Sequence, residues 1–266
     1  MILKRIITGV SVAVIVAVII WLGDPWLTIA ACIISALAAF EFYRIVKCEH
    51  IQPLTYPGIF FSILFVLNSH ISHPYSQAFL LALIILVLLI WVLFKQDKDN
   101  AFINVAWTIT GIFYTGFLLS FYISMRNFTN GMGWLFLVLT CTALCDVAAY
   151  AFGSWLGKHP LAVSVSPHKT IEGSIAGLIA SILFAVLLGI FFKLPVSYLQ
   201  MVITGVVIAV FAQIGDLVES LLKRNMKAKD TGYILPGHGG ILDRIDSHLL
   251  VAPVAYFLVL LLTKQG

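Results

Sequence analysis

Charged side chains are scarce in this 266-residue chain. Asp, Glu, Lys and Arg make up 11% of the residues and hydrophobic residues 61%, and the mean hydropathy is +1.04. Soluble chains carry about 25% charged residues, so the composition excludes an ordinary soluble protein and predicts an integral membrane protein. The net charge of +4 is too small for a nucleic-acid-binding face, and we expect no nucleic-acid partner.

Several common motifs are also missing. The four cysteines contain no C-x-x-C pair, so neither a disulfide framework nor a zinc site is indicated. The sequence has no G-x-x-x-x-G-K-[ST] phosphate loop, no G-x-S-x-G elbow, no H-E-x-x-H zinc motif and no G-x-G-x-x-G fingerprint. These absences exclude the usual soluble nucleotide-binding and hydrolase folds.

Long apolar runs dominate the chain instead. A helix needs about 20 mainly apolar residues to cross a bilayer, and nine segments qualify. They are residues 5–22, 26–45, 55–71, 77–95, 102–124, 132–154, 173–192, 197–222 and 247–264. The first resembles a signal peptide, but it is longer than usual and lacks a small-x-small cleavage site, so we interpret it as a retained helix. The third is the weakest, because Asn68, His70 and His73 crowd its end.

The distribution of Lys and Arg predicts the orientation. With the N-terminus in the cytoplasm, thirteen of the sixteen basic residues lie on the inner side, and only Arg126, Lys193 and Lys264 lie on the outer side. The sequence therefore predicts an all-α, polytopic membrane protein with one domain over residues 1–266, about nine transmembrane helices and a cytoplasmic N-terminus. Its polar loops near 155–172 and 220–246 then face the cytoplasm.

Four carboxylates fall inside the predicted helices, namely Glu41, Asp146, Asp216 and Glu219. Each costs at least about 2.5 to 3.5 kcal/mol near the bilayer centre, and all four lie near the inner ends of their helices. For Glu41, three positions before Arg44, pairing with loop cations near the interface remains an equal alternative to a functional role. Asp216 lies about 10 Å deeper than Lys223, which favours a polar cavity.

The segment from Ser220 to Asp246 is the most polar part of the chain. Asp216, Glu219, Ser220 and Lys223 share one helical face because of their i, i+3, i+4, i+7 spacing. The segment then combines cations suited to phosphate oxygens, a glycine-rich turn and two carboxylates; these are Lys223, Arg224, Lys227 and Lys229, then Pro236 to Gly240, then Asp243 and Asp246. A polybasic patch that binds lipid headgroups is the simpler alternative.

The carboxylates predict a magnesium site. Asp243 and Asp246, together with Asp216, resemble the ligands of a hard divalent cation, and a second cation is possible. Cations, a glycine nest and a carboxylate-bound metal are what phosphoryl-type transfer requires, because its catalysis consists mainly of positioning and charge neutralisation.

The loop after the sixth helix has similar chemistry. Asp146 precedes it, and Ser166 and Lys169 lie near its end. Ser166-Pro167 could also be an ordinary helix start. Lys169 at a helix N-terminus is unfavourable with the helix dipole unless it faces an anion, which favours a ligand site.

The chain resembles the CDP-diacylglycerol synthases, also called phosphatidate cytidylyltransferases. The matching positions are Ser220, Lys223-Arg224, Lys229-Asp230, Gly232, Pro236, His238-Gly239-Gly240, Asp243-Arg244 and Asp246, with Asp146, Tyr150, Gly157-Lys158, Ser166-Pro167-x-Lys169-Thr170-x-Glu172-Gly173 and Gly215-Asp216. The pattern is specific and extends over most of the chain. His168 departs from it, since the family commonly carries a second Lys there.

The resemblance implies an enzyme of the cytoplasmic (inner) membrane that condenses CTP with phosphatidic acid to give CDP-diacylglycerol and pyrophosphate. It also implies magnesium dependence and a homodimer. In this interpretation Asp216, Asp243 and Asp246 hold Mg²⁺, with Asp146 as a secondary candidate. The phosphates of both substrates are bound by Lys223, Arg224, Lys227, Lys229 and Arg244, and Ser166, Lys169, Ser220, Gly239 and Gly240 complete the binding site. His238 either donates to pyrophosphate or supports the turn.

Three alternatives remain. A CTP-dependent lipid or polyprenol kinase would use the same substrate classes but transfer the γ-phosphoryl group. An ion-coupled transporter would place its buried carboxylates near the bilayer midplane between repeats, whereas these lie toward one side. A structural polybasic membrane protein would not need Asp216.

Overall fold

The computed structural model describes residues 2–47, 51–71, 75–94, 100–228, 230–232 and 239–263, with the backbone alone for residues 2–8 and 10. It contains ten α-helices and one β-hairpin within these ranges. The helices are α1 (Ile2–Leu22), α2 (Trp26–Val46), α3 (Thr55–Asn68), α4 (Ser76–Phe94), α5 (Ala101–Ile112), α6 (Leu118–Arg126), α7 (Gly131–Leu156), α8 (Ile171–Phe191), α9 (Tyr198–Asn225) and α10 (Leu242–Thr263). A π-helical turn, η2 (Phe113–Phe117), joins α5 and α6.

Each of the nine predicted segments corresponds to helix in the structure, the fifth of them to α5, η2 and α6 together. The last helix begins five residues earlier than predicted, at Leu242, so that Asp243 and Asp246 lie inside it. By length and composition, seven helical segments of the described chain could cross a membrane: α2, α4, α5 to α6, α7, α8, α9 and α10. The weakly predicted third segment forms a helix of only 14 residues, about 21 Å long.

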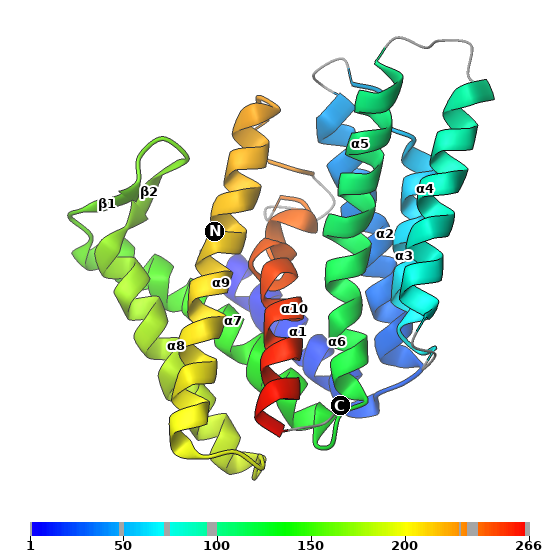
Figure 1. Cartoon of the computed structure of the whole chain (residues 1–266). Coiled ribbons are helices and arrows are strands. Elements are labelled where there is room, and N and C mark those ends of the chain that lie inside the picture. Colours follow the sequence, from blue (N-terminus) through cyan, green and yellow to red (C-terminus); the bar gives the residue numbers. More distant parts are fainter. Residues whose placement is uncertain are drawn as a thin grey trace.

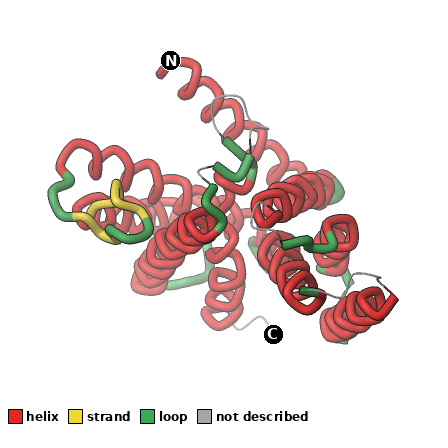
Figure 2. Tube along the Cα trace, turned by 90° about the horizontal axis from the view of Figure 1, so that it is seen from above, coloured by secondary structure: helices red, strands yellow, loops and turns green. Residues whose placement is uncertain are grey.

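The helices form a bundle whose two ends differ in character (Figure 1). The β-hairpin and the C-terminal end of α9 lie at one end, and the α6–α7 and α8–α9 connections lie at the other. Figure 2 looks along most of the helices but shows α1 lengthwise, so α1 is inclined to the bundle. The chain segments predicted to carry the chemistry therefore gather at one end.

The β-hairpin was not predicted. Strands β1 (Pro160–Ala162) and β2 (Ser166–Thr170) pair antiparallel, with Ala162 opposite Ser166. The interpretation of Ser166-Pro167 as a helix start is wrong, because both residues lie in β2. The N-cap of α8 is Thr170, whose hydroxyl accepts a hydrogen bond from Gly173 N.

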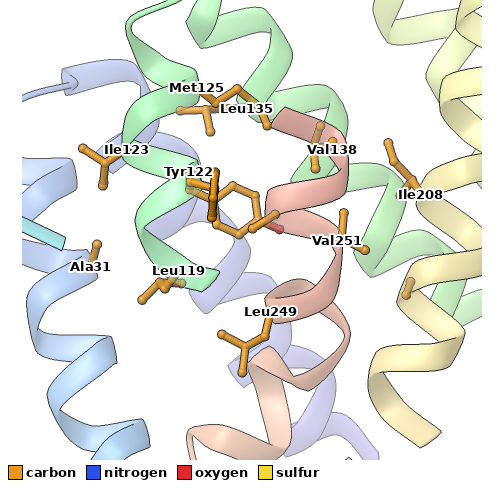
Figure 3. Packing of buried hydrophobic residues seen from close by; sticks show 14 of the residues in the cluster. Ala31, Leu119, Tyr122, Ile123, Met125, Leu135, Val138, Ile208, Leu249 and Val251 are labelled. Carbon is orange, nitrogen blue, oxygen red and sulfur yellow. The ribbon is translucent and has the colours of Figure 1, made fainter. Parts of the chain in front are cut away.

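Two kinds of packing hold the bundle together. Large apolar side chains such as Tyr122, Leu135, Val138 and Val251 fill the space between α6, α7 and α10 (Figure 3). Helices α8 and α9 instead approach through small residues. A Cβ atom added at Gly205 would lie 2.6 Å from Ile182 Cα and 3.0 Å from Ser181 O, both backbone atoms.

This contact generates a stability prediction. Gly205→Ala forces α8 and α9 apart, because the backbone atoms of Ile182 cannot move aside independently, and overpacking of this kind typically costs about 1 to 3 kcal/mol. We expect the melting temperature of the detergent-purified protein to fall by several degrees. Gly9→Ala is the matched control, since nothing lies within 4 Å of the added Cβ atom. Equal melting temperatures for the two variants would contradict close α8–α9 packing.

Candidate active site

Three carboxylates from three helices lie within electrostatic reach of one another near the polar end of the bundle. Asp146 lies in α7, Asp216 in α9 and Asp246 in α10. Each of the three carboxylates interacts electrostatically with the other two. Ser247 N donates to Asp246 Oδ1 at 2.8 Å. Like charges at close range repel in an apolar setting, so this cluster favours the approach of a cation.

Lys169 contributes one positive charge to the cluster from the hairpin. Its Nζ lies 2.7 Å from Asp216 Oδ2, and it also interacts with Asp146. Strand β2 thus returns a lysine to the carboxylates of α7 and α9. This contact explains how Lys169 is tolerated next to the N-terminus of α8, where the helix dipole disfavours a cation.

A cavity of about 460 Å³ opens beside this ion pair, within the size range of small-molecule sites. Its lining comes from α7, the hairpin, α8 and α9. The lining residues are Asp146, Ala149, Tyr150, Gly153, Ser154, Leu161, His168, Lys169, Thr170, Gly173, Ser174, Gln213 and Asp216. Three site residues predicted from the sequence, Asp146, Lys169 and Asp216, therefore share one cavity.

Sequence reasoning missed three polar residues of this cavity, Ser154, Ser174 and Gln213. The Ser174 hydroxyl donates to Gln213 Oε1, and Gln213 Nε2 donates to Ser174 O at 3.1 Å. The signal was available, because a glutamine three positions before Asp216 in an apolar helix needs a buried partner. Together Ser174 and Gln213 connect α8 to α9 beside the carboxylates.

A second ionic group lies around Lys223. Its Nζ is 2.8 Å from Asp243 Oδ1 and 2.5 Å from Glu219 Oε2, and Glu219 is completely buried. The other oxygen of Asp243, Oδ2, accepts hydrogen bonds from Thr231 N at 3.0 Å and Gly240 N at 2.8 Å. Asp243 therefore joins α9, the start of α10 and the glycine turn.

The remaining predicted residues surround these two groups. The exposed Arg224 donates from Nε to Val165 O in the hairpin turn at 3.3 Å. Gly239 has a φ of +81°, and a Cβ atom there would lie 2.9 Å from Asp243 Oδ2, so the position favours glycine. Ser166 and Ser220 are half-buried in β2 and α9, Lys227 and Arg244 are exposed after α9 and in α10, and Lys229 and His238 lie outside the described residues.

Glu41 does not lie at the membrane interface as an exposed carboxylate. Its side chain is completely buried, and Oε2 accepts a hydrogen bond from Leu242 N at 2.8 Å. An interfacial carboxylate paired with loop cations would be partly exposed, so that alternative is wrong. Glu41 instead holds the first residue of α10.

The carboxylates of the site are candidate ligands for a metal ion. Over the ranges described above, no three His, Cys, Asp or Glu side chains are arranged as a ready-made metal site, and Asp216 and Asp243 are held by different lysines. The chemistry of Asp146, Asp216 and Asp246 nevertheless fits a hard cation. Carboxylate oxygens are the ligands that Mg²⁺ prefers. Lys169 interacts electrostatically with Asp146, and Lys223 does so with Asp246.

Comparisons with known proteins identify the family of this chain. The model of the cytidylyltransferase family matches residues 3–262. A phosphatidate cytidylyltransferase from Bacillus subtilis is 33% identical over 262 residues, which cover 97% of each chain. A protein of the same name from Synechocystis is 29% identical over 286 residues and 97% of each chain, and one from Staphylococcus haemolyticus is 31% identical over 261 residues, 96% of this chain and 98% of the other. With nearly its whole length matched, the chain belongs to the cytidylyltransferase family.

Proposed function

We propose that the protein is a phosphatidate cytidylyltransferase of phospholipid biosynthesis, which transfers CMP from CTP to phosphatidic acid. The observation that carries this proposal is the cavity in which Asp146, Lys169 and Asp216 meet, within a bundle of apolar helices. Its setting suits a reaction that joins a water-soluble nucleotide to a membrane lipid. Family membership and the names of the relatives point to the same reaction.

The reaction balances as an in-line substitution. A phosphate oxygen of phosphatidic acid attacks the α-phosphorus of CTP and forms the new P–O bond. The bond between the α-phosphorus and the oxygen that bridges to the β-phosphorus breaks, and pyrophosphate leaves with the electron pair. No covalent enzyme intermediate is required, since the site residues named above include no obvious nucleophile.

The cations of the site bind the phosphate groups in this proposal. Lys169 and Lys223 are held by Asp216 and by Asp243 with Glu219, which fixes their positions next to the cavity and the glycine turn. Arg224, Lys227 and Arg244 are exposed at the same end of the protein and suit the outer phosphates. Ser166, Ser220 and Gly239 supply neutral donors, and Lys229 and His238 are further proposed ligands. The N–H of Gly240 already donates to Asp243 Oδ2, so this glycine contributes close approach of the backbone rather than a donor.

Magnesium is the proposed cofactor. Asp216 and Asp246 are two of the proposed ligands. The third is either Asp243, which the sequence predicts, or Asp146, which interacts with Asp246. Mg²⁺ bound there would neutralise phosphate oxygens and make the α-phosphorus more electrophilic. Asp243 already accepts hydrogen bonds from two backbone amides and forms an ion pair with Lys223. These contacts favour Asp146 as the third magnesium ligand.

We further propose nine membrane crossings, a cytoplasmic N-terminus and an active site that faces the cytoplasm. The basic loops support this orientation, and CTP is a cytoplasmic substrate. The short α3 and the inclined α1 complete the nine crossings in this proposal. The cytoplasmic membrane remains the predicted location and a homodimer the predicted assembly.

The transferred group can be identified with labelled CTP. We expect label from the α-phosphate to enter the lipid and label from the γ-phosphate to leave as pyrophosphate. Asp243→Asn removes a charge that holds Lys223, and we expect a loss of at least about 100-fold in activity. Asp24→Asn is the matched control, because Asp24 binds Thr28 at the opposite end of α2. Label from the γ-phosphate in the lipid would identify a kinase instead.

Magnesium dependence tests the carboxylate cluster. We expect chelation to abolish activity and added Mg²⁺ to restore it. Asp216→Asn and Asp246→Asn should raise the half-saturating Mg²⁺ concentration by at least about tenfold, because each removes a proposed ligand. A similar increase in Asp146→Asn but not in Asp243→Asn would identify Asp146 as the third ligand. Full activity in the presence of chelator would contradict a magnesium site.

The orientation can be measured by labelling single cysteines in intact cells with a membrane-impermeant maleimide. Val163 in the hairpin is 65% exposed and Tyr198 at the start of α9 is 69% exposed. In a background without the four natural cysteines, Val163→Cys should react only after the membrane is permeabilised, whereas Tyr198→Cys should react at once. The reverse pattern would invert the proposed topology.

A further inference from the structure

Glu41 in α2 is distant in sequence from every other residue of the site, yet it contacts the segment that carries the site's carboxylates. Its Oε2 accepts hydrogen bonds from Leu242 N at 2.8 Å and from the Thr231 hydroxyl at 3.4 Å. Leu242 is the first residue of α10 and is completely buried, as is Glu41 itself. The contact therefore joins two elements 201 positions apart inside the protein.

The start of α10 needs such a partner. The first backbone N–H groups of a helix have no acceptor within the helix, and water cannot satisfy the N–H of a buried residue. A carboxylate at this position also interacts favourably with the helix dipole. Glu41 thus caps α10 from another helix, a role that neighbouring residues usually perform, and fixes α10 relative to α2.

The backbone of Gly232 and Gly240 packs directly against the Glu41 carboxylate. A Cβ atom added at Gly232 or at Gly240 would collide with the Glu41 carboxylate. One turn further along α2, Arg44 Nη2 donates to Thr231 O at 3.1 Å. Helix α2 therefore contacts both loop segments that precede or begin α10, residues 230–232 and 239–242.

These contacts continue into the site. Thr231 N and Gly240 N, next to the groups that touch Glu41, both donate to Asp243 Oδ2. Asp243 Oδ1 in turn binds Lys223 of α9 at 2.8 Å. Asp246 lies three residues further along the same helix and belongs to the carboxylate cluster. The backbone that Glu41 holds is thus the backbone that carries both carboxylates of α10.

We propose that Glu41 is a positioning residue for cytidylyl transfer. Glu41 is not among the residues that line the cavity. It acts by fixing the first turn of α10 so that Asp243 and Asp246 are aligned with Lys223 and Asp216. The inference rests on the proposed function for its catalytic consequence. The capping of α10 can be measured without any reaction.

Two measurements on the detergent-purified full chain test the proposal. Amide hydrogen exchange should become about tenfold faster in Glu41→Ala, but only in peptides that contain Leu242, because the acceptor of that N–H is lost. Because a displacement of about 1 Å can cost about 100-fold in rate, kcat should fall by roughly that factor. KM for CTP and for phosphatidic acid should change by less than about threefold, since the phosphate-binding side chains remain.

Conservative variants separate positioning from folding. Glu41→Gln keeps an acceptor oxygen at the same reach and should retain at least about a third of the wild-type kcat. Glu41→Asp keeps the charge but withdraws the carboxylate by about 1.5 Å; it replaces Glu41→Ala if that variant does not fold, and should lower kcat at least about tenfold. Ser35→Ala is the control, because Ser35 is an equally buried polar residue of α2.

Two outcomes overturn the proposal. One is a folded Glu41→Ala or Glu41→Asp variant whose kcat lies within about twofold of wild type. The other is faster exchange throughout the bundle with kcat and KM impaired together, which would make Glu41 a general stabilising residue. If wild type itself forms no CDP-diacylglycerol while the exchange change at Leu242 appears, the proposed function fails and the capping of α10 stands.

Discussion

The structure depends on the neutralisation of charge inside an apolar helix bundle. Lys223 lies between Glu219 and Asp243, and Lys169 pairs with Asp216. Glu219 is completely buried, and breaking its pair with Lys223 leaves an uncompensated charge, which is strongly unfavourable. The side chains of Lys169 and Asp216 are partly exposed, so breaking their pair costs less. Each pair also joins separate elements, α9 to α10 in the first case and the hairpin to α9 in the second. The ionic contacts that make the charges tolerable therefore also determine how these elements are arranged.

Small residues determine where the charges meet. A Cβ atom at Gly173 would lie 2.5 Å from Ala149 O, and one at Gly177 would lie 2.8 Å from Cys145 O. Helices α7 and α8 thus approach closely at Cys145 and Ala149, on either side of Asp146 in the sequence. Because α7 and α8 are close together, Thr170 and the hairpin residues before it also line the cavity. The polar site therefore depends on the close packing of these two helices. Bulky residues at these glycines would separate the site as well as the helices.

The sequence predicts the helices well because long apolar runs can satisfy their backbone groups only as helix in a membrane. It also predicts the shared face of Asp216, Glu219 and Lys223, since helical spacing alone determines it. It does not predict the hairpin, because strands of three and five residues, whose exposed and half-buried side chains do not alternate, carry no periodic pattern. Nor does it predict the η2 turn, which packs closely against α3: a Cβ atom added at Gly116 would lie 2.5 Å from Ser62 Cα.

Contacts between distant segments are the part of the site that no local pattern encodes. Glu41 is recognisable in the sequence as an intramembrane carboxylate, but its partners, Thr231 and Leu242, are identified only by the fold. The same holds for the pair formed by Gln213 and Ser174. Burial of a polar residue can be inferred from its surroundings in the sequence, whereas its partner cannot.

The ion pairs also shape how substrates would bind under the proposed function. Lys169 and Lys223 each have carboxylate partners in the protein alone, so in the proposed reaction a nucleotide phosphate would be bound by an exchange of partners. Lys169 would bind phosphate, and Asp216 would then be free to help hold Mg²⁺, which would neutralise phosphate oxygens. Both charges stay compensated throughout, and neither lysine has to be transferred from water to the protein interior. The cost of burying these charges is thus already included in the folded state, which leaves the site organised for phosphate before substrate is present.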